Sequence, residues 1–157
     1  RPVVHLFGTL EDGRPFLVRD AREVPHFYIE ARDASRARAL GARSQSPSER
    51  LTLEGQPVVR VEVPTPSDTP PLRERLSRAG IRTHEADVRF ALRSLIDRGI
   101  RGSLEIRGEG RARPGVGVVF EDPELAPADW TPSLNVLSFD IETDPRATFS
   151  DGAGWCW

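Results

Sequence analysis

Residues 25–84 follow a succession of strand-like and helix-like patterns that few folds can accommodate. The stretch opens with an alternating strand pattern, and a short helix pattern capped by Asp33 then ends at Gly41. Two further strand patterns flank residues 54–56, where Gly55 favours a hairpin turn. A second helix pattern, with prolines in its first turn, ends at Gly80 before a last short strand. The expected order is therefore βαββαβ.

This order predicts an α+β fold with a ferredoxin-like or RNA-recognition-motif-like unit over about residues 25–87. Strands are expected over residues 25–31, 51–53, 57–63 and 81–84, and helices over residues 33–40 and from Ser67 or Asp68 to Ala79. The strand over residues 57–63 should be central in the sheet. A structure in which this strand is helical or unpaired would contradict the prediction.

Further strands are expected on both sides of this unit. Residues 3–8 and 14–19 should pair across an Asp-Gly step, which supplies the positive φ that a hairpin turn needs. Residues 103–107 and 116–120 should form a second hairpin, across a loop that contains Arg111 and Arg113. The chain is therefore predicted to carry β-hairpins before and after the central unit.

A third helix pattern and a connecting segment complete the region before residue 134. The helix should begin after a cap at Asp87 and end at Gly99. Its predicted buried stripe consists of Val88, Ala91, Leu92, Leu95 and Ile96. Residues 121–133, rich in proline and acids, are interpreted as a linker across the surface.

Residues 134–144 are interpreted as a buried strand that carries two acids on one face. Asp140 and Glu142 are two positions apart, so both side chains can reach one hard cation or a pair of Mg²⁺ ions. Acids on a central strand are costly unless they bind something. The alternative is a strand at a sheet edge with two solvated carboxylates.

The charge distribution separates a basic segment from an acidic one, although the net charge is only −2. Residues 88–113 contain seven arginines against three acids, whereas residues 121–145 contain seven acids and no base. A basic segment suits phosphate, and an acidic segment suits a cation. The single Cys156 excludes an internal disulfide and fits a reducing cytoplasm. No apolar run is long enough to span a membrane, and the absence of methionine suggests a piece of a longer protein.

An aromatic residue and several arginines are candidates for nucleic-acid binding. RNA-recognition motifs stack bases on aromatic residues of their two central strands. Tyr28 could serve on one such strand, but the other offers Arg60 and no aromatic residue, so a scaffold role for Tyr28 is the alternative. The candidate nucleic-acid-binding residues are Tyr28, Arg60, Arg107, Arg111 and Arg113.

Three motifs resemble family B DNA polymerases, within which the chain is most similar to bacterial DNA polymerase II. The first exonuclease motif of that family resembles Leu137-Ser138-Phe139-Asp140-Ile141-Glu142-Thr143. A helix of its amino-terminal domain resembles Phe90-x-Leu92-Arg93-x-Leu95-Ile96-Asp97. A strand of the same domain is similar to Pro25-His26-Phe27-Tyr28-Ile29, with His26 where the family commonly has tyrosine. The resemblance runs from residue 3 to about residue 147.

The resemblance implies that residues 1–133 form the amino-terminal domain of a DNA-directed DNA polymerase with a 3′→5′ proofreading exonuclease. Residues 134–157 would begin the ribonuclease-H-like exonuclease domain, with Asp140 and Glu142 as catalytic metal ligands for Mg²⁺ or Mn²⁺. The implied partners are primer–template DNA and the remaining polymerase domains, and the implied location is the bacterial cytoplasm, at the nucleoid. Whether the domain reads template uracil, as archaeal relatives do, stays open.

The chain itself should lack both activities and bind no cation, because the remaining carboxylates and the polymerase palm belong to motifs that do not occur in it. We expect Leu137, Phe139 and Ile141 to pack against the amino-terminal domain or a second copy of the chain, since bare apolar side chains would form an adhesive patch. Two other classes stay open. A stand-alone nucleic-acid-binding module should show salt-dependent affinity for DNA, and a ligand-free structural domain should not bind even at low salt.

Overall fold

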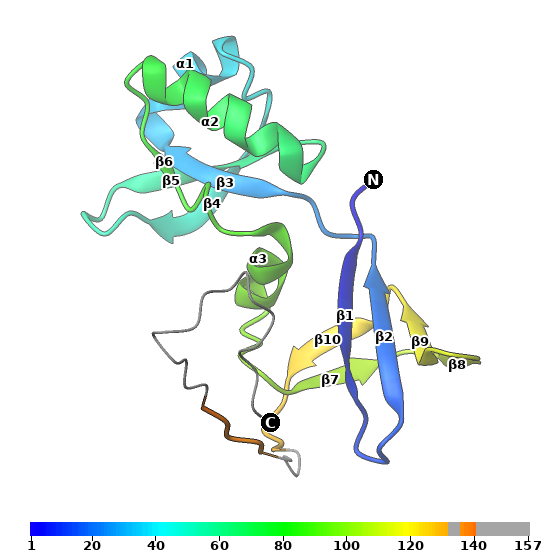
Figure 1. Ribbon diagram of the computed structural model, residues 1–157. Helices are drawn as coiled ribbons and strands as arrows, with labels where there is room; N and C mark the ends of the chain where they lie inside the picture. Colours follow the sequence, from blue (N-terminus) through cyan, green and yellow to red (C-terminus); the bar gives the residue numbers. More distant parts are fainter. Residues whose placement is uncertain (132–135, 141–157) are drawn as a thin grey trace, which may run out of the picture.

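The computed structural model describes residues 1–131 and 136–140, in an α+β arrangement of three sheets and a few helices (Figure 1). The strands are β1 (Val4–Thr9), β2 (Pro15–Asp20), β3 (His26–Glu30), β4 (Ser44–Leu51), β5 (Pro57–Glu62), β6 (Thr83–His84), β7 (Leu104–Arg107), β8 (Gly110–Arg113), β9 (Gly117–Glu121) and β10 (Glu124–Pro127). Sheet A has the strand order β1-β2-β9-β8, sheet B has the order β4-β5-β3-β6, and β7 pairs with β10 in a third sheet.

Three α-helices and two 3₁₀ turns accompany these strands in the described part of the chain. They are η1 (Ala31–Asp33), α1 (Ala34–Ala39), η2 (Pro66–Asp68), α2 (Thr69–Arg78) and α3 (Phe90–Asp97). Helices α1 and α2 lie together on one side of sheet B, while α3 lies between sheet B and sheet A (Figure 1). Among these described residues, no helix is long and apolar enough to cross a membrane.

Sheet B contains the predicted succession of strands and helices. Strand β5 pairs with β4 on one side and with β3 on the other, so the expected central strand is central. All pairings in this sheet are antiparallel. Alternate residues of β3 and β5, such as Phe27, Ile29 and Val61, face the helices and pack with Leu72 and Leu76 of α2. This core follows from the period-two pattern of the strands and the helical spacing of the leucines.

Strand β4 is longer than the sequence predicts, because it also includes residues 44–50, where no apolar alternation indicates a strand. The strand pairs only with β5 and therefore forms an edge of the sheet. An edge strand can keep polar side chains in water, so apolar alternation is not required there. Its register shifts between Pro47 and Leu51, which further obscures the pattern.

Sheet A joins the first strands of the chain to late ones. The expected hairpin of β1 and β2 is present, and β2 then pairs in parallel with β9. A separate core forms where Phe16 and Val18 of β2 meet Val118 and Phe120 of β9. The hairpin of β7 and β10 contributes Ile106 and Leu125 to this core.

The predicted hairpin of residues 103–107 with residues 116–120 is wrong. Strand β9 pairs with β8, which lies inside the expected loop, and β7 pairs with β10, which lies inside the expected linker. Gly115 has φ 76°, and the Val116 amide donates to the Arg113 carbonyl oxygen, so a tight turn closes β8 onto β9. The arginine-rich segment is therefore an edge strand.

Helix α3 buries the side opposite to the predicted one. Leu92 and Ile96 are 52% and 45% exposed, whereas Arg93 and Ser94 are buried. The expected cap at Asp87 is also absent, since the helix begins at Phe90. The reason is that charged groups of both sheets face the helix, so its polar side pairs inward.

Residues 136–140 do not form the buried strand that the sequence predicts over residues 134–144. They have no strand partner among the described residues, and Leu137 and Phe139 are exposed rather than packed on the amino-terminal region. A strand needs paired neighbours to be stable, and the described part of the chain supplies none here. Ile141 and Glu142 lie outside the described residues.

Candidate nucleic-acid interface

The face of sheet B that points away from α1 and α2 carries the first group of candidate residues. Tyr28 on β3 and Arg60 on β5 are direct cross-strand partners on this face. They face away from the helices because Phe27 and Ile29, the neighbours of Tyr28 along the strand, fill the core. The sequence placed Tyr28 and Arg60 together correctly.

Two arginines cover the Tyr28 ring. The guanidinium carbons of Arg50 and Arg93 lie 5.4 and 5.8 Å from its centroid, within cation–π range, and Tyr28 is only 6% exposed. Burial raises the pKa of the Tyr28 hydroxyl. A nucleobase would have to displace these arginines to stack on Tyr28, so this geometry favours the scaffold role.

Acidic side chains hold both arginines in place. Arg50 donates to Asp97 of α3 at 2.7 Å, and Arg93 lies 2.7 Å from Glu85. Arg93 also approaches Asp97 at 3.6 Å. Because Arg93 is buried, its charge is stabilised only by these neighbours and by the tyrosine ring. The cluster attaches α3 to sheet B through charge rather than through apolar packing.

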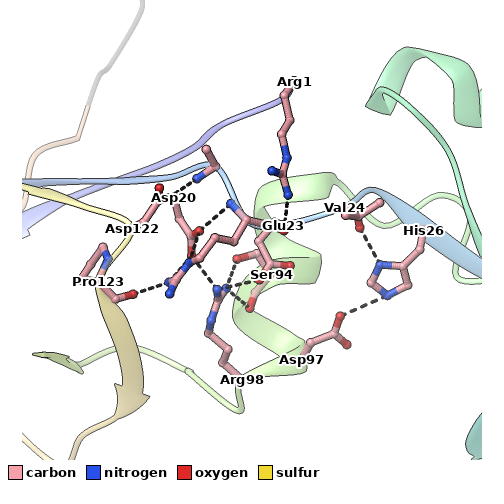
Figure 2. A network of polar contacts seen from close by, with 12 residues as sticks. Arg1, Asp20, Glu23, Val24, His26, Ser94, Asp97, Arg98, Asp122 and Pro123 are labelled. Carbon is pink, nitrogen blue, oxygen red and sulfur yellow. Dashed lines mark hydrogen bonds and ion pairs between the residues drawn. The ribbon is translucent and has the colours of Figure 1, made fainter. Parts of the chain in front are cut away.

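His26 connects the same cluster to the start of β3 (Figure 2). Its Nδ1 donates to the Val24 carbonyl oxygen at 2.9 Å, while its Nε2 faces Asp97 at 3.2 Å and the Tyr28 hydroxyl at 3.4 Å. Burial lowers the pKa of His26. Asp97 opposes this only weakly, because its carboxylate is already shared with Arg50. We therefore describe His26 as neutral at pH 7, with Tyr28 donating to Nε2.

This assignment predicts that stability falls as the pH drops below about 6.5, the ordinary histidine pKa. The unfolded chain then binds a proton that the folded chain resists, at a limiting slope of about 1.4 kcal/mol per pH unit for one group. Urea unfolding of His26→Gln should show a shallower loss between pH 7 and pH 5 than the unsubstituted chain. His5→Gln, at an exposed position, serves as the control and should keep the full slope. Equal slopes for all three proteins would contradict a neutral His26.

A cavity of about 380 Å³ opens beside this cluster. Its walls come from the starts of β3, α2 and α3. Arg73, Arg89 and Arg93 line it, against the single acid Asp87. This wall is rich in hydrogen-bond donors and suits a ligand group rich in acceptors.

A second polar network attaches α3 to sheet A (Figure 2). Asp20, at the end of β2, is fully buried and accepts hydrogen bonds from the side chains of Arg22 and Arg98 at distances of 2.6–3.1 Å. Arg98, directly after α3, also lies 2.6 Å from Glu23. Arg22 extends the network to the Pro123 carbonyl oxygen. Together with the His26–Asp97 contact, this network holds α3 between the two sheets.

The remaining candidate arginines lie away from Tyr28, on other strands. Arg107 on β7 makes two hydrogen bonds of 2.9 Å to Glu105, which occupy its guanidinium. Arg111 on β8 is exposed and lies 3.7 Å from Glu109. Arg113 on the same strand pairs with no acid among residues 1–131 and 136–140. The structure thus divides the five candidates into a covered pair on sheet B, a neutralised Arg107, and two available arginines on sheet A.

The described residues do not form a metal site. Asp140 is exposed, and within the described ranges no group of three or more histidine, cysteine or acidic side chains is placed to hold an ion. Its predicted partner Glu142 lies outside those ranges. The residues present therefore do not fit Mg²⁺ by themselves, and the assignment of Asp140 and Glu142 as metal ligands stays a prediction.

Three important residues of the α3 cluster were not predicted as functional: Arg50, Arg93 and Asp97. Arg93 and Asp97 are four residues apart in the motif that resembles a polymerase helix, and opposite charges at this spacing could have indicated a pair. Arg50 comes from a distant edge strand, and no local pattern indicates it.

Comparison with known proteins gives one informative result. No family model matches the chain, and no curated protein matches it. Among solved structures, the chain is similar to the family B DNA polymerase from the hyperthermophilic archaeon Pyrobaculum calidifontis, with a TM-score of 0.66 and 28% sequence identity. The match covers 85% of this chain and 19% of that chain. The chain therefore has a fold like that of part of a family B polymerase, and it spans about a fifth of that protein. The match does not indicate bacterial DNA polymerase II in particular.

Proposed function

We propose that this chain is the amino-terminal part of a family B DNA polymerase, of the type of bacterial DNA polymerase II, acting in the cytoplasm at the nucleoid. The observation that carries the proposal is the structural likeness to such a polymerase over 85% of the chain. The strand order β4-β5-β3-β6, with α1 and α2 on one face, supports a ferredoxin-like unit within residues 1–133. Residues 134–157 would begin the exonuclease domain.

Within the polymerase, this domain acts as a scaffold that contacts the template. The cluster around Tyr28 and Arg93 closes the open face of sheet B, so the cavity beside Arg93 is the place there that can accept an acceptor-rich group of DNA. Primer–template DNA and the remaining polymerase domains are its partners. Primer extension by the protein encoded by the uninterrupted gene tests the proposal directly, and its failure with every primer–template would contradict it.

We further propose that Asp140 and Glu142 are acids of the 3′→5′ exonuclease, where they would hold Mg²⁺ or Mn²⁺ with carboxylates from outside this chain. The apolar residues that precede Asp140, and the Asp-x-Glu spacing itself, support this role. Bound metal ions would polarise the scissile phosphate and generate the attacking hydroxide.

In the intact polymerase, Asp140→Ala and Glu142→Ala should each lower excision of a mismatched 3′ end at least about 100-fold, a barrier change of roughly 3 kcal/mol. Primer extension should continue, because a different domain performs it. Asp129→Ala, at another exposed acid, is the matched control and should leave both reactions unchanged. Excision that survives both substitutions would remove these residues from the mechanism.

A stand-alone nucleic-acid-binding module is the second candidate function. The exposed arginines Arg111 and Arg113 on the edge of sheet A favour it. Salt-dependent DNA binding by a protein that never extends a primer would support this candidate over the polymerase.

A further inference from the structure

The outer face of sheet A, opposite the face covered by β7 and β10, combines an exposed aromatic residue with cationic side chains. Strand pairing aligns its residues in rows across the sheet. One row runs from Phe7 on β1 through Leu17 and Val119 to Arg111 on β8. The alternate residues, which include Phe16 and Phe120, fill the core on the inner face. Phe7 and Arg111 therefore share the outer face, about 14 Å apart by strand spacing.

Phe7 is unusual on this face because its side chain is 74% exposed. The ring of His5, two residues earlier on the same strand, stands perpendicular to it with centroids 6.3 Å apart. His5 is exposed as well. An exposed phenylalanine makes no contribution to the core, and a free aromatic surface beside a second ring can stack on a planar group.

Cationic groups lie at the opposite edge and beside the aromatic pair. Arg113 has no acidic partner in the described part of the chain, and Arg111 is 3.7 Å from an exposed glutamate. Arg19, the cross-strand partner of His5, is exposed enough to reach solvent although it contacts Glu121 at 2.9 Å. The face therefore offers aromatic surface on β1 and guanidinium groups on β8.

We propose that the outer face of sheet A binds single-stranded nucleic acid, with a base stacked on Phe7 beside His5 and with phosphates on Arg111 and Arg113. Sheet faces that bind single strands use this combination of aromatic residues for bases and positive charge for the backbone. The strand would run across the sheet, from β1 to β8. The site does not depend on the assignment of the chain to a polymerase, since it rests on sheet A alone.

A protein partner is the alternative occupant, and the exposed apolar area disfavours it. Val119 is buried and Leu17 is half-buried, so the free apolar surface of this row is essentially one phenyl ring. A ring supplies at most about 250 Å². Protein-docking patches are contiguous and several hundred Å² or larger. One ring face is enough for a base.

The test measures fluorescence anisotropy of short labelled oligothymidine and oligouridine with the 157-residue chain over a range of salt concentrations. Phe7→Leu should weaken binding about 10-fold, because leucine keeps the apolar character and loses the stacking surface. Phe7→Tyr should retain the affinity. The double variant Arg111→Ala/Arg113→Ala should weaken binding and reduce the salt dependence by up to about two phosphate contacts.

Matched controls make the result decisive. Arg38→Ala/Arg43→Ala removes the same charge from exposed positions on the sheet B unit, and this variant should bind like the unsubstituted chain. Circular dichroism should show that all variants remain folded, since every substituted side chain is exposed. Tighter binding of one oligomer identifies DNA or RNA as the ligand. Absence of binding at low salt, equal binding of duplex DNA, or insensitivity to Phe7→Leu would overturn the proposal.

Discussion

Alanine at position 117 is expected to cost the protein roughly 3–5 kcal/mol of unfolding free energy and to break the parallel pairing of β2 with β9. Gly117 has φ 101°, a conformation that side chains with a Cβ rarely adopt. An added Cβ would also lie 2.1 Å from the Pro15 carbonyl oxygen, far inside contact distance. That oxygen belongs to the backbone of the neighbouring strand, so it cannot move without opening the sheet.

Gly115→Ala is the control for this experiment. Gly115 has a similar positive φ of 76°, but nothing lies within 4 Å of the position that an added Cβ would occupy. It should lose only the conformational cost, about 1 kcal/mol. Urea unfolding of both variants separates the two contributions, and equal losses would show that β2 and β9 are not as close as described.

Removal of the Asp20 carboxylate is expected to lower the unfolding free energy by about 3 kcal/mol. Asp20 is fully buried, and Asp20→Ala would leave the guanidinium groups of Arg22 and Arg98 without their shared acceptor. The loss should appear as detachment of α3 from sheet A, because Arg98 follows that helix directly. Asp20→Asn should be less harmful, since it keeps an acceptor in the same place.

Asp12→Ala is the matched control for Asp20→Ala. Asp12 holds Arg14 through its backbone amide and its side chain, as Asp20 holds Arg22, but the Asp12 pair is exposed to water. Exposed pairs contribute little, so Asp12→Ala should leave the urea midpoint nearly unchanged. Similar losses for both variants would show that burial does not set the strength of the Asp20 network.

The pH dependence of the Asp20 contribution follows from its pKa. Burial alone would raise the pKa of Asp20, but hydrogen bonds from Arg22 and the charges of Arg22 and Arg98 outweigh burial and hold it below the ordinary 3.8. The stabilisation is therefore fully present above pH 3.8 and is lost as the pH falls through the lower folded pKa.

Local patterns predict the elements of sheet B well, because strand alternation and helix spacing can be read within a few residues. Strand β5 shows this, since alternation over residues 57–63 indicated both the strand and its inward-facing Val61. The partner of a strand is a different matter. Nothing in the sequence near β7 indicates that it pairs with β10 rather than with β9, since pairing depends on which apolar faces meet in three dimensions.

The orientation of α3 and the composition of the site show the same boundary. Helical spacing identified an apolar side with Leu92 and Ile96, but it could not reveal that charged groups of two sheets lie across from the other side. Likewise, Tyr28 could be recognised as an aromatic residue on a sheet face, while its cover by Arg50 and Arg93 depends on segments far apart in the sequence. The roles of Asp140 and Glu142 stay predictions.

The position of α3 has a consequence for how the protein tolerates change over evolution. The cores of sheets A and B share no side chain among the described residues, and α3 meets each sheet through polar contacts. Substitutions in one core should therefore combine additively with substitutions in the other. Epistasis should concentrate instead at Asp97 and Arg98, adjacent residues that contact different sheets. Each core can diverge on its own, while these two positions must change together with their partners.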